Sequence, residues 1–223
     1  VTQYTRSGKR LRVLDCEDFT SDIAGDVTKN ELYVPAGFNL RCYDMHTGKL
    51  KRKLALDSLS VISCVFFENA LWMLRGTFQN GTMEYSLSKM DCQSGDIQNL
   101  GIFYKESYGN KPFAFMSNGN FSIYQGRLFF ALNSGNSLYE IRGNKIVPYL
   151  QWQIEPKEHY SPQYEAICDK GKVGRYLFVN YRLMFLENGD EAAHHWFVKD
   201  LESDRQFNVH LEWEEGVCVR GTE

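Results

Sequence analysis

Short runs rich in Val, Ile, Leu, Phe and Tyr recur along the whole chain, separated by polar breaks of Gly, Asn, Asp and Ser. Such runs predict β-strands, because branched and flat side chains pack well on a pleated surface. The few stretches with helical spacing, such as residues 187–195, are short and lie between predicted strands. The strands form groups of four, and the second strands of the groups align at Leu32–Val34, Leu71–Met73, Leu128–Phe130 and Leu177–Val179.

A polar hairpin turn recurs between the third and fourth strands of each group. Its clearest copies are residues 43–49 and 90–96, with weaker copies at 4–9 and 139–145 and a glycine-free copy at 198–204. The turn glycines are Gly8, Gly48, Gly95 and Gly143, spaced 40, 47 and 48 residues apart. A period in the forties built from short strands is typical of β-propeller blades. A two-sheet sandwich is the main rival, but its strands do not recur in groups of four with the same hairpin.

The pattern therefore predicts an all-β chain, a β-propeller of the six-bladed type made of four-stranded antiparallel blades. One domain covers residues 1–223, with a partial blade at 1–22, blades at about 23–60, 61–112, 113–160 and 161–213, and a partial strand at 214–223. Two readings of the ring remain open: its two chain ends complete one blade together, or part of the ring is missing from this sequence.

Composition narrows the function classes. A hydrophobic content of 43% is ample for a core. The net charge is −3, and the Lys and Arg residues are not clustered along the sequence. Nucleic-acid binding is disfavoured, because it depends on clustered Lys and Arg. No apolar run approaches the roughly 18–20 residues that span a bilayer. The chain begins within a repeat and carries no leader peptide, so we read it as a fragment or a processed form.

The cysteines give no metal or redox motif. None of the six forms a CxxC pair, so a zinc ribbon or thioredoxin-like site is unsupported. Cys42, Cys64 and Cys92 lie in apolar runs and are expected to be buried thiols. A disulfide remains the alternative, and the pairing state stays open for Cys16, Cys42, Cys64, Cys92, Cys168 and Cys218.

Residues 120–130, 136–141 and 145–148 carry a resemblance to a known family. They resemble an uncharacterised bacterial family of six-bladed β-propellers related in outline to NHL-repeat proteins. The resemblance implies an envelope or secreted protein, located in the periplasm, on the outer-membrane surface or outside the cell. It also implies a lipid anchor in an N-terminal region not included in this chain. The matching motifs are structural, so the resemblance implies no active site.

The most metal-like string is residues 187–195. If it were helical, Glu191 and His195 would share a face and could hold an ion. If His194 and His195 begin a strand, they point to opposite faces and cannot both bind one ion. We expect a solvated loop and no cofactor. The alternative is a divalent metal ion in the central channel, as in metal-dependent lactonases built on six blades.

Long connections give the strongest functional signal. The predicted loops at 75–80, 105–112, 155–164 and 183–193 share one side of a propeller and are rich in aromatic and basic residues. Such side chains combine flat apolar area with a polar tip and suit recognition, although they also suit a lid that seals the sheets. The predicted ligand-binding residues are Arg75, Phe78, Tyr108, His159, Tyr160, Tyr164, Arg182 and His194.

Two functions follow as expectations. The first is a non-catalytic binding or scaffold protein of the cell envelope, which recognises a glycan, a peptide or an envelope protein on this aromatic side. The alternative is a metal-dependent hydrolase or lactonase of the six-bladed type. A bound divalent ion in the channel would favour the enzyme, and a channel filled by side chains would favour binding.

Overall fold

The computed structural model describes residues 2–4, 7–14, 22–56, 60–107, 119–132, 137–151, 160–165, 175–185, 191–209, 212–213 and 219–220. Every regular element in these ranges is a β-strand, as predicted. The chain divides into two compact units, Val1–Phe115 and Met116–Glu223. The single domain and the six blades remain predictions.

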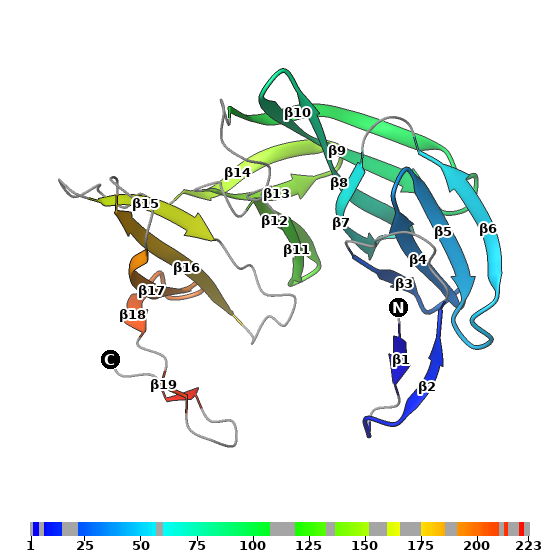
Figure 1. Ribbon diagram of the computed structural model, residues 1–223, viewed down its shortest axis with the longest axis horizontal. Coiled ribbons are helices and arrows are strands. Elements are labelled where there is room, and N and C mark those ends of the chain that lie inside the picture. The colour runs from blue at the N-terminus through cyan, green and yellow to red at the C-terminus, as the bar shows by residue number, and fades with distance from the viewer. Residues whose placement is uncertain are drawn as a thin grey trace. The chain divides into compact units, whose positions relative to one another are not determined.

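Four four-stranded antiparallel sheets follow one another along the chain (Figure 1). In each sheet the strand order follows the chain order, so each is a simple meander. Sheet 1 contains β3 (Ala24–Asp26), β4 (Glu31–Ala36), β5 (Asn39–Asp44) and β6 (Leu50–Ala55). Sheet 2 contains β7 (Ser60–Phe67), β8 (Ala70–Gln79), β9 (Thr82–Asp91) and β10 (Ile97–Ser107).

The second unit contains the other two sheets. Sheet 3 is built from β11 (Gly119–Tyr124), β12 (Arg127–Leu132), β13 (Ser137–Arg142) and β14 (Lys145–Gln151). Sheet 4 is built from β15 (Tyr160–Glu165), β16 (Tyr176–Phe185), β17 (Glu191–Asp200) and β18 (Gln206–Val209). One strand pair precedes the four sheets in the sequence, β1 (Thr2–Tyr4) with β2 (Arg10–Val13). Another follows them in the sequence, β19 (Glu212–Trp213) with β20 (Val219–Arg220).

The predicted second strands are confirmed and form the buried centre of each sheet. Tyr33, Val34, Leu71, Met73, Leu128 and Phe130 are fully buried, and Leu177 is nearly so. Fourth strands are much more exposed, as the described side chains of β6, β10 and β14 show. Burial thus falls from the middle strands to the fourth strand, as expected when sheets stack through their first three strands.

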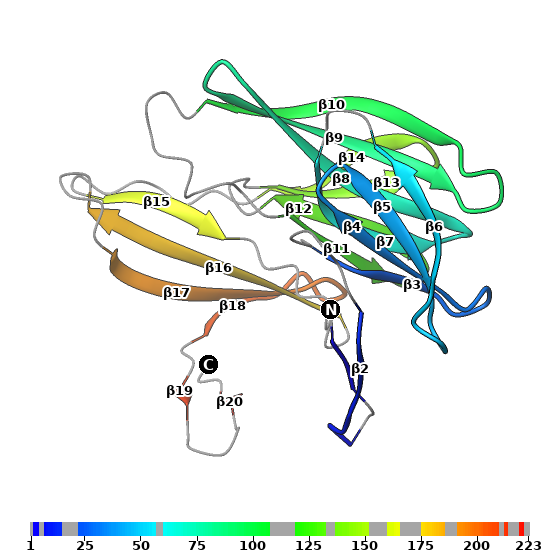
Figure 2. The same ribbon diagram turned by 45° about the vertical axis from the view of Figure 1, so that its right-hand side comes forward.

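Sheets 1 and 2 pack face to face within the first unit (Figure 2). Tyr33, Leu40 and Cys42 from sheet 1 join Leu71 and Met73 from sheet 2 in one core. The opposite face of sheet 1 is covered as well, because Val34 and Tyr43 pack with Leu14, the residue after β2. Residues that alternate along a strand point to opposite faces, so sheet 1 is apolar on both of them.

The second unit has a matching core between its sheets. Phe129, Ala131 and Leu138 of sheet 3 pack with Leu177 of sheet 4. Tyr149 and Leu150 of β14, Phe197 of β17 and Leu201 in the turn after β17 also pack against this core. Both units therefore contain two sheets joined by one apolar layer.

The recurrent turns adopt the predicted left-handed backbone. Gly48 has φ 70°, and a Cβ there would lie 2.8 Å from Cδ of Arg12 and 3.0 Å from Cδ2 of Leu14. Glycine is therefore needed both for its conformation and for the close approach of the β2 segment. In the glycine-free copy Asp204 takes this role with φ 60°.

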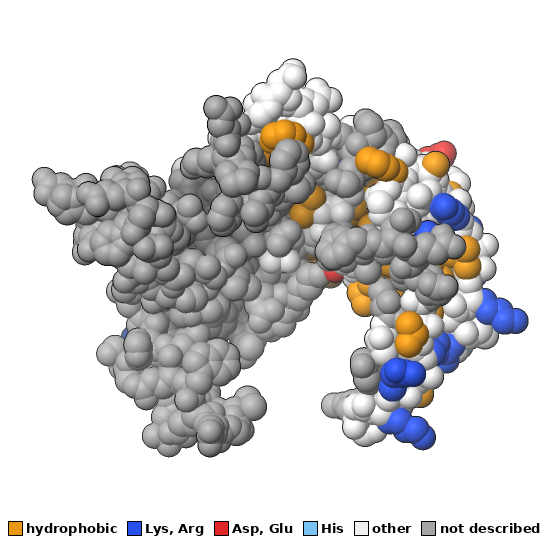
Figure 3. Space-filling view, viewed as in Figure 1, with side chains coloured by type: hydrophobic (Ala, Val, Ile, Leu, Met, Phe, Trp, Pro, Cys, Tyr) orange, Lys and Arg blue, Asp and Glu red, His pale blue; other side chains and the backbone are white. Residues whose placement is uncertain are grey.

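Charged side chains mark the exposed parts of the first unit. Lys51 and Lys53 on β6 are exposed, and so is Arg10 on β2. Figure 3 shows Lys and Arg side chains along the side of this unit that carries β2 and β6. Charges on an edge strand discourage pairing with a strand from another molecule.

Candidate functional site

The two ends of each sheet differ in their chain connections. In sheets 1 and 2, the turns after the first and third strands lie at one end, here named the capped end: residues 27–30, 45–49, 68–69 and 92–96. The turn after the second strand lies at the opposite end, here named the far end: Gly37–Phe38 and Asn80–Gly81. In sheet 4, residues 201–205 form the capped end, and the link between β16 and β17 belongs to the far end.

An aspartate closes the recurrent turn at the capped end. Asp44 Oδ1 accepts hydrogen bonds from the backbone N–H groups of His46 (3.0 Å) and Thr47 (2.7 Å), and from the Thr47 hydroxyl (2.9 Å). Asp91 and Asp200 accept the equivalent two backbone N–H bonds in their own turns. These hydrogen bonds from Thr47 and His46 hold the pKa of Asp44 below its ordinary value.

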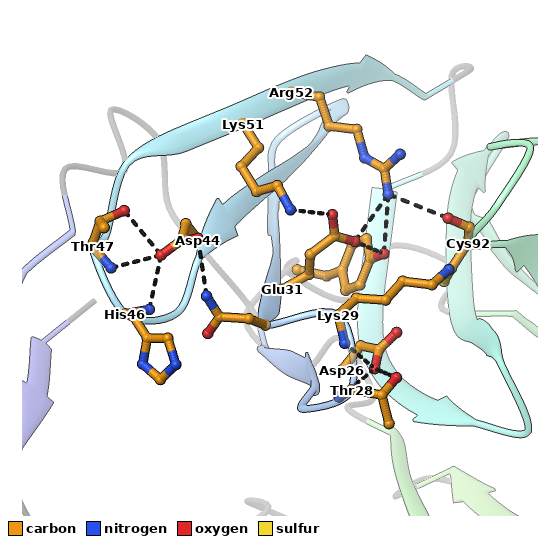
Figure 4. A network of polar contacts seen from close by, with 12 residues as sticks. Asp26, Thr28, Lys29, Glu31, Asp44, His46, Thr47, Lys51, Arg52 and Cys92 are labelled. Carbon is orange, nitrogen blue, oxygen red and sulfur yellow. Dashed lines mark hydrogen bonds and ion pairs between the residues drawn. The ribbon is translucent and has the colours of Figure 1, made fainter.

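A buried carboxylate crosslinks the capped end of sheet 1 (Figure 4). Glu31 Oε1 accepts a hydrogen bond from Lys51 Nζ at 2.7 Å, and Oε2 accepts one from the Tyr33 hydroxyl at 2.7 Å. Arg52 Nη2 also donates to Oε2 at 3.2 Å and reaches the carbonyl oxygen of Cys92 in sheet 2 at 3.5 Å. One network therefore joins β4 and β6 of sheet 1 and reaches the turn that follows β9 of sheet 2.

The second unit repeats this arrangement with different residues. Glu140 of β13 is 4% exposed and is held by Arg127 (Nε to Oε1, 2.7 Å) and Arg142 (Nε to Oε2, 2.8 Å). In sheet 4, Arg175 lies 2.9 Å from Asp200 and 3.1 Å from Glu202. Both sheets of this unit thus have a charged clamp near the capped end.

The pKa shifts of these groups indicate a structural role. The hydrogen bond from Arg127 lowers the pKa of Glu140 to about 2, against an opposing effect of burial. Burial raises the pKa of Glu31, but hydrogen bonds from Lys51 and Tyr33 outweigh it and leave that pKa below its ordinary value. Carboxylates fixed in their ionised form by permanent partners are poor proton acceptors near neutral pH.

The described thiols of the first unit also have structural positions. Cys42, Cys64 and Cys92 are free and buried, which confirms the reading of these three as small core residues. Burial raises the pKa of Cys42 to about 11 and also raises that of Cys92. The thiolate is the reactive form, so neither thiol is a nucleophile at neutral pH. Cys16, Cys168 and Cys218 lie outside the described residues.

Two of the predicted ligand-binding residues lie in sheet 2. Arg75 occupies β8 opposite Ser86 and is 1% exposed, so it is a core residue and not a loop residue. Phe78 is half-buried opposite Met83. Nearby, the buried hydroxyl oxygens of Thr77 and Ser86 have no hydrogen-bond partner among the described residues.

Four predicted residues lie on three adjacent strands of sheet 4. Tyr160 and Tyr164 are in β15, Arg182 is in β16 and His194 is in β17. Arg182 and His194 are register partners, directly opposite each other on neighbouring strands. Tyr164 pairs with Tyr181, so Tyr160 and Tyr164 occupy the alternate positions of β15, on the other face from Arg182 and His194. The backbone therefore brings Arg182 and His194 together and separates them from the two tyrosines. Tyr108 and His159 lie outside the described residues.

The predicted loops were too long, which is an error of strand boundaries. Residues 75–79 continue β8, since an Asn80–Gly81 turn with φ 51° and 75° closes the hairpin there. This two-residue turn matches the type that Asn-Gly favours, and the sequence analysis overlooked that signal. Residues 105–107, 160–164 and 183–185 likewise belong to β10, β15 and β16.

The solvated loop expected over the histidine string is wrong for residues 191–195. Residues 191–195 are part of β17, so His194 and His195 occupy successive strand positions that alternate between the two faces. Among the described residues, no three His, Cys, Asp or Glu side chains lie close enough to hold a metal ion.

Register also identifies residues that the sequence analysis missed. Arg182 lies between two register partners, His194 on β17 and Gln163 on β15. Trp196 lies two positions after His194 on β17. At the far end of sheet 1, Phe38 is 58% exposed in the turn between β4 and β5. β15 ends at Glu165 and β16 begins at Tyr176, so no tight-turn signal in the sequence gave the pairing of Gln163 with Arg182.

Comparisons with known proteins support the fold alone. No family model matches the chain, and no curated protein matches it. A proposed exported protein of Bacteroides fragilis is similar in structure, with a TM-score of 0.60 and 14% identity over 92% of this chain. Hydrazine synthase of Kuenenia stuttgartiensis has a TM-score of 0.53 and 10% identity over 91% of this chain. The chain spans 64% and 55% of these proteins. No helix of the described residues could cross a membrane.

Proposed function

We propose that this chain is the larger part of a six-bladed β-propeller, in which each four-stranded sheet is one blade. Three observations support this architecture. The sheets are meanders, the middle strands of sheets 1 to 3 are buried while the described side chains of their fourth strands are more exposed, and neighbouring sheets within each unit share an apolar layer. Propeller blades have this construction. The NHL-like bacterial family named above is part of the same proposal.

The protein is a non-catalytic binding protein of the bacterial envelope, and its far end recognises a glycan, a peptide or an envelope protein. The observation that carries this proposal is the register of sheet 4, which places Arg182 directly opposite His194 on neighbouring strands. Guanidinium and imidazole groups held side by side on a sheet are well suited to hold a ligand in one orientation.

The ionisable groups at the capped ends support binding over catalysis. Glu31, Glu140 and Asp200 are engaged in fixed ion pairs or turn hydrogen bonds that stabilise the sheets. A location in the periplasm, on the cell surface or outside the cell is also favoured by the similarity to a proposed exported protein.

Binding to an immobilised panel of glycans, peptides and envelope fractions tests this function. We expect the chain to retain a ligand from one of these classes without changing it, and Arg182→Ala to abolish retention. Arg10→Ala is the matched control, because Arg10 is an exposed arginine on β2. Hydrolysis of a lactone or ester that requires added Ca²⁺ or Zn²⁺ would instead support the metal-dependent hydrolase.

A further inference from the structure

One face of sheet 2 changes from apolar to polar along its length. Leu71 and Met73 of β8 lie in the apolar layer between sheets 1 and 2. Positions two apart on a strand share a face, so Arg75 and Thr77 follow them on the same face toward the far end. The residues of β9 that lie opposite Met73, Arg75 and Thr77 are Ser88, Ser86 and Glu84. The layer between the two sheets therefore continues as a strip of polar side chains.

Three side chains of this strip, Ser88, Ser86 and Thr77, are here named the hydroxyl row. Ser88 is 0% exposed and Ser86 is 3% exposed. The hydroxyl oxygens of all three are buried and have no hydrogen-bond partner among the described residues. In the part of the chain that the structure describes, they are the only buried hydroxyls in this condition. Ser63, an equally buried serine of β7, instead donates to Asp22 Oδ2 at 2.7 Å.

A buried hydroxyl that forms no hydrogen bond destabilises the folded state, because it has lost its contacts with water and gained none in return. Most buried polar side chains of folded proteins therefore have a partner, which is often an ordered water molecule. Three exceptions side by side on one face point to one common partner. Since a hydroxyl both donates and accepts hydrogen bonds, a partner that does the same satisfies the whole row.

The spacing of the hydroxyl row suits water as that partner. Ser88 and Ser86 are two positions apart on β9, which separates their Cα atoms by roughly 7 Å. Thr77 is the diagonal neighbour of Ser86, at about 7–8 Å. One water molecule bridges two hydroxyl oxygens about 5.6 Å apart, and rotation of the side chains supplies the remaining approach. Arg75, directly opposite Ser86, carries five N–H donors and can bond to water in addition to its other partners.

Exposure rises along the strip toward the far end. Ser88 is fully buried and Thr77 is half-buried. The side chain of Glu84, opposite Thr77, is 24% exposed, and that of its ion-pair partner Lys105 is 59% exposed. The hydroxyl row thus leads from the core to the surface, which gives water a route by which it can enter and exchange.

We propose that the hydroxyl row binds ordered water molecules and forms a hydrated seam that enters the layer between sheets 1 and 2 from the far end. Water bound here satisfies the three hydroxyls and stabilises the packing of the sheets where the apolar layer stops. The seam involves no residue of sheet 4, so this inference is independent of the proposed binding function.

The sign of a change in Tm tests the seam on the whole chain. Thr77→Val removes the hydroxyl and keeps the shape of the side chain. If the hydroxyl is bound to water, we expect Tm to fall by about 2–4 °C, the shift that follows the loss of one hydrogen bond in a chain of this length. If the hydroxyl is buried without a partner, the same substitution removes a destabilising group and raises Tm. Ser88→Ala should also lower Tm, and Ser107→Ala, at an exposed serine of β10, should leave it unchanged.

Crystal structures of the parent chain and of Ser88→Ala give the direct measurement. We expect water oxygens within about 3 Å of the Ser86 and Ser88 hydroxyls in the parent, and the loss of the water beside residue 88 in Ser88→Ala. An anion in place of water, hydroxyls bonded directly to protein groups, or a raised or unchanged Tm of Thr77→Val overturns the inference. None of these outcomes concerns ligand retention through Arg182, so the proposed function stands or fails separately.

Discussion

The capped ends and the far ends of the sheets are built from different chemistry. At the capped ends, aspartates close the turns and Glu31 and Glu140 hold clamps of cationic side chains. At the far ends, Phe38 is exposed and the register of sheet 4 places Arg182 directly opposite His194. The capped ends thus hold the paired carboxylates, and the far ends hold predicted ligand-binding residues.

This difference in chemistry assigns stability to the capped end of each sheet and recognition to the far end. Interactions that complete a turn or neutralise a buried carboxylate lower the free energy of the folded chain and gain nothing from exposure. Groups for a ligand must stay accessible and therefore contribute little to folding. Substitutions at the capped end should change the free energy of unfolding, and substitutions at the far end should change binding.

The largest effect is expected in the core at the capped end of sheet 2. Leu71 is fully buried between sheets 1 and 2, so Leu71→Ala should lower the free energy of unfolding by about 2–5 kcal/mol. Leu50→Ala is the matched control, because Leu50 is 52% exposed on β6. Urea unfolding measures both, and equal effects would mean that the apolar layer between these sheets is not as described.

The Glu140 clamp should make stability depend on pH. Its pKa of about 2 lies below the ordinary value of 4.5, so its contribution is present above pH 4.5 and disappears as the pH falls toward 2. Allowing for solvent around the partly exposed arginines, this amounts to about 1–3 kcal/mol. Urea unfolding of Glu140→Gln between pH 2 and 5 should show a flatter profile than the parent chain, and parallel profiles would contradict the clamp.

A smaller effect is expected at the aspartate turn. Asp44→Ala removes three hydrogen bonds to the turn between β5 and β6 and should lower Tm by less than Glu140→Gln does. Lys49→Ala, in the same turn, should leave Tm unchanged because its side chain is exposed. Differential scanning calorimetry compares the two. A Tm of Asp44→Ala equal to that of Lys49→Ala would show that the carboxylate does not cap the turn.

The smallest effect on stability is expected at the far end of sheet 1. Phe38→Ala should change the free energy of unfolding by no more than about 0.5 kcal/mol, because the ring is exposed. Gly37→Ala in the same turn should cost more, about 1 kcal/mol, since Gly37 has φ 57°. A large loss in Phe38→Ala would assign the ring to the core and remove one element of the comparison.

Much of the fold could be predicted from the sequence because it is encoded locally. Apolar runs marked the second strands, and the polar turns marked Gly48 and Gly95 with their left-handed backbones. The far-end boundaries were harder, since β8 extends past the point where its apolar run stops. Backbone pairing continues through polar residues, as in the Thr77–Glu84 pair, and hydrophobic pattern alone does not report that.

The candidate site was predicted less well for the same reason. Arg75 was expected in a loop and is a buried strand residue, because a long side chain beside buried hydroxyls can be part of a core. The pairing of Arg182 with His194 and Gln163 depends on register, which is set by links between strands rather than by the residues themselves. Composition identified the right residue types but not their neighbours.

Measuring ligand retention and the free energy of unfolding together, in Arg182→Ala, Tyr160→Ala and Glu31→Gln, tests the separation of the two ends most directly. The account predicts that Arg182→Ala and Tyr160→Ala lose the ligand and unfold like the parent chain. It predicts that Glu31→Gln keeps the ligand and unfolds more readily, because Lys51, Arg52 and Tyr33 lose their common carboxylate. If Arg182→Ala and Tyr160→Ala instead lose stability and ligand to the same degree as Glu31→Gln, the far end is a structural lid and the account is wrong.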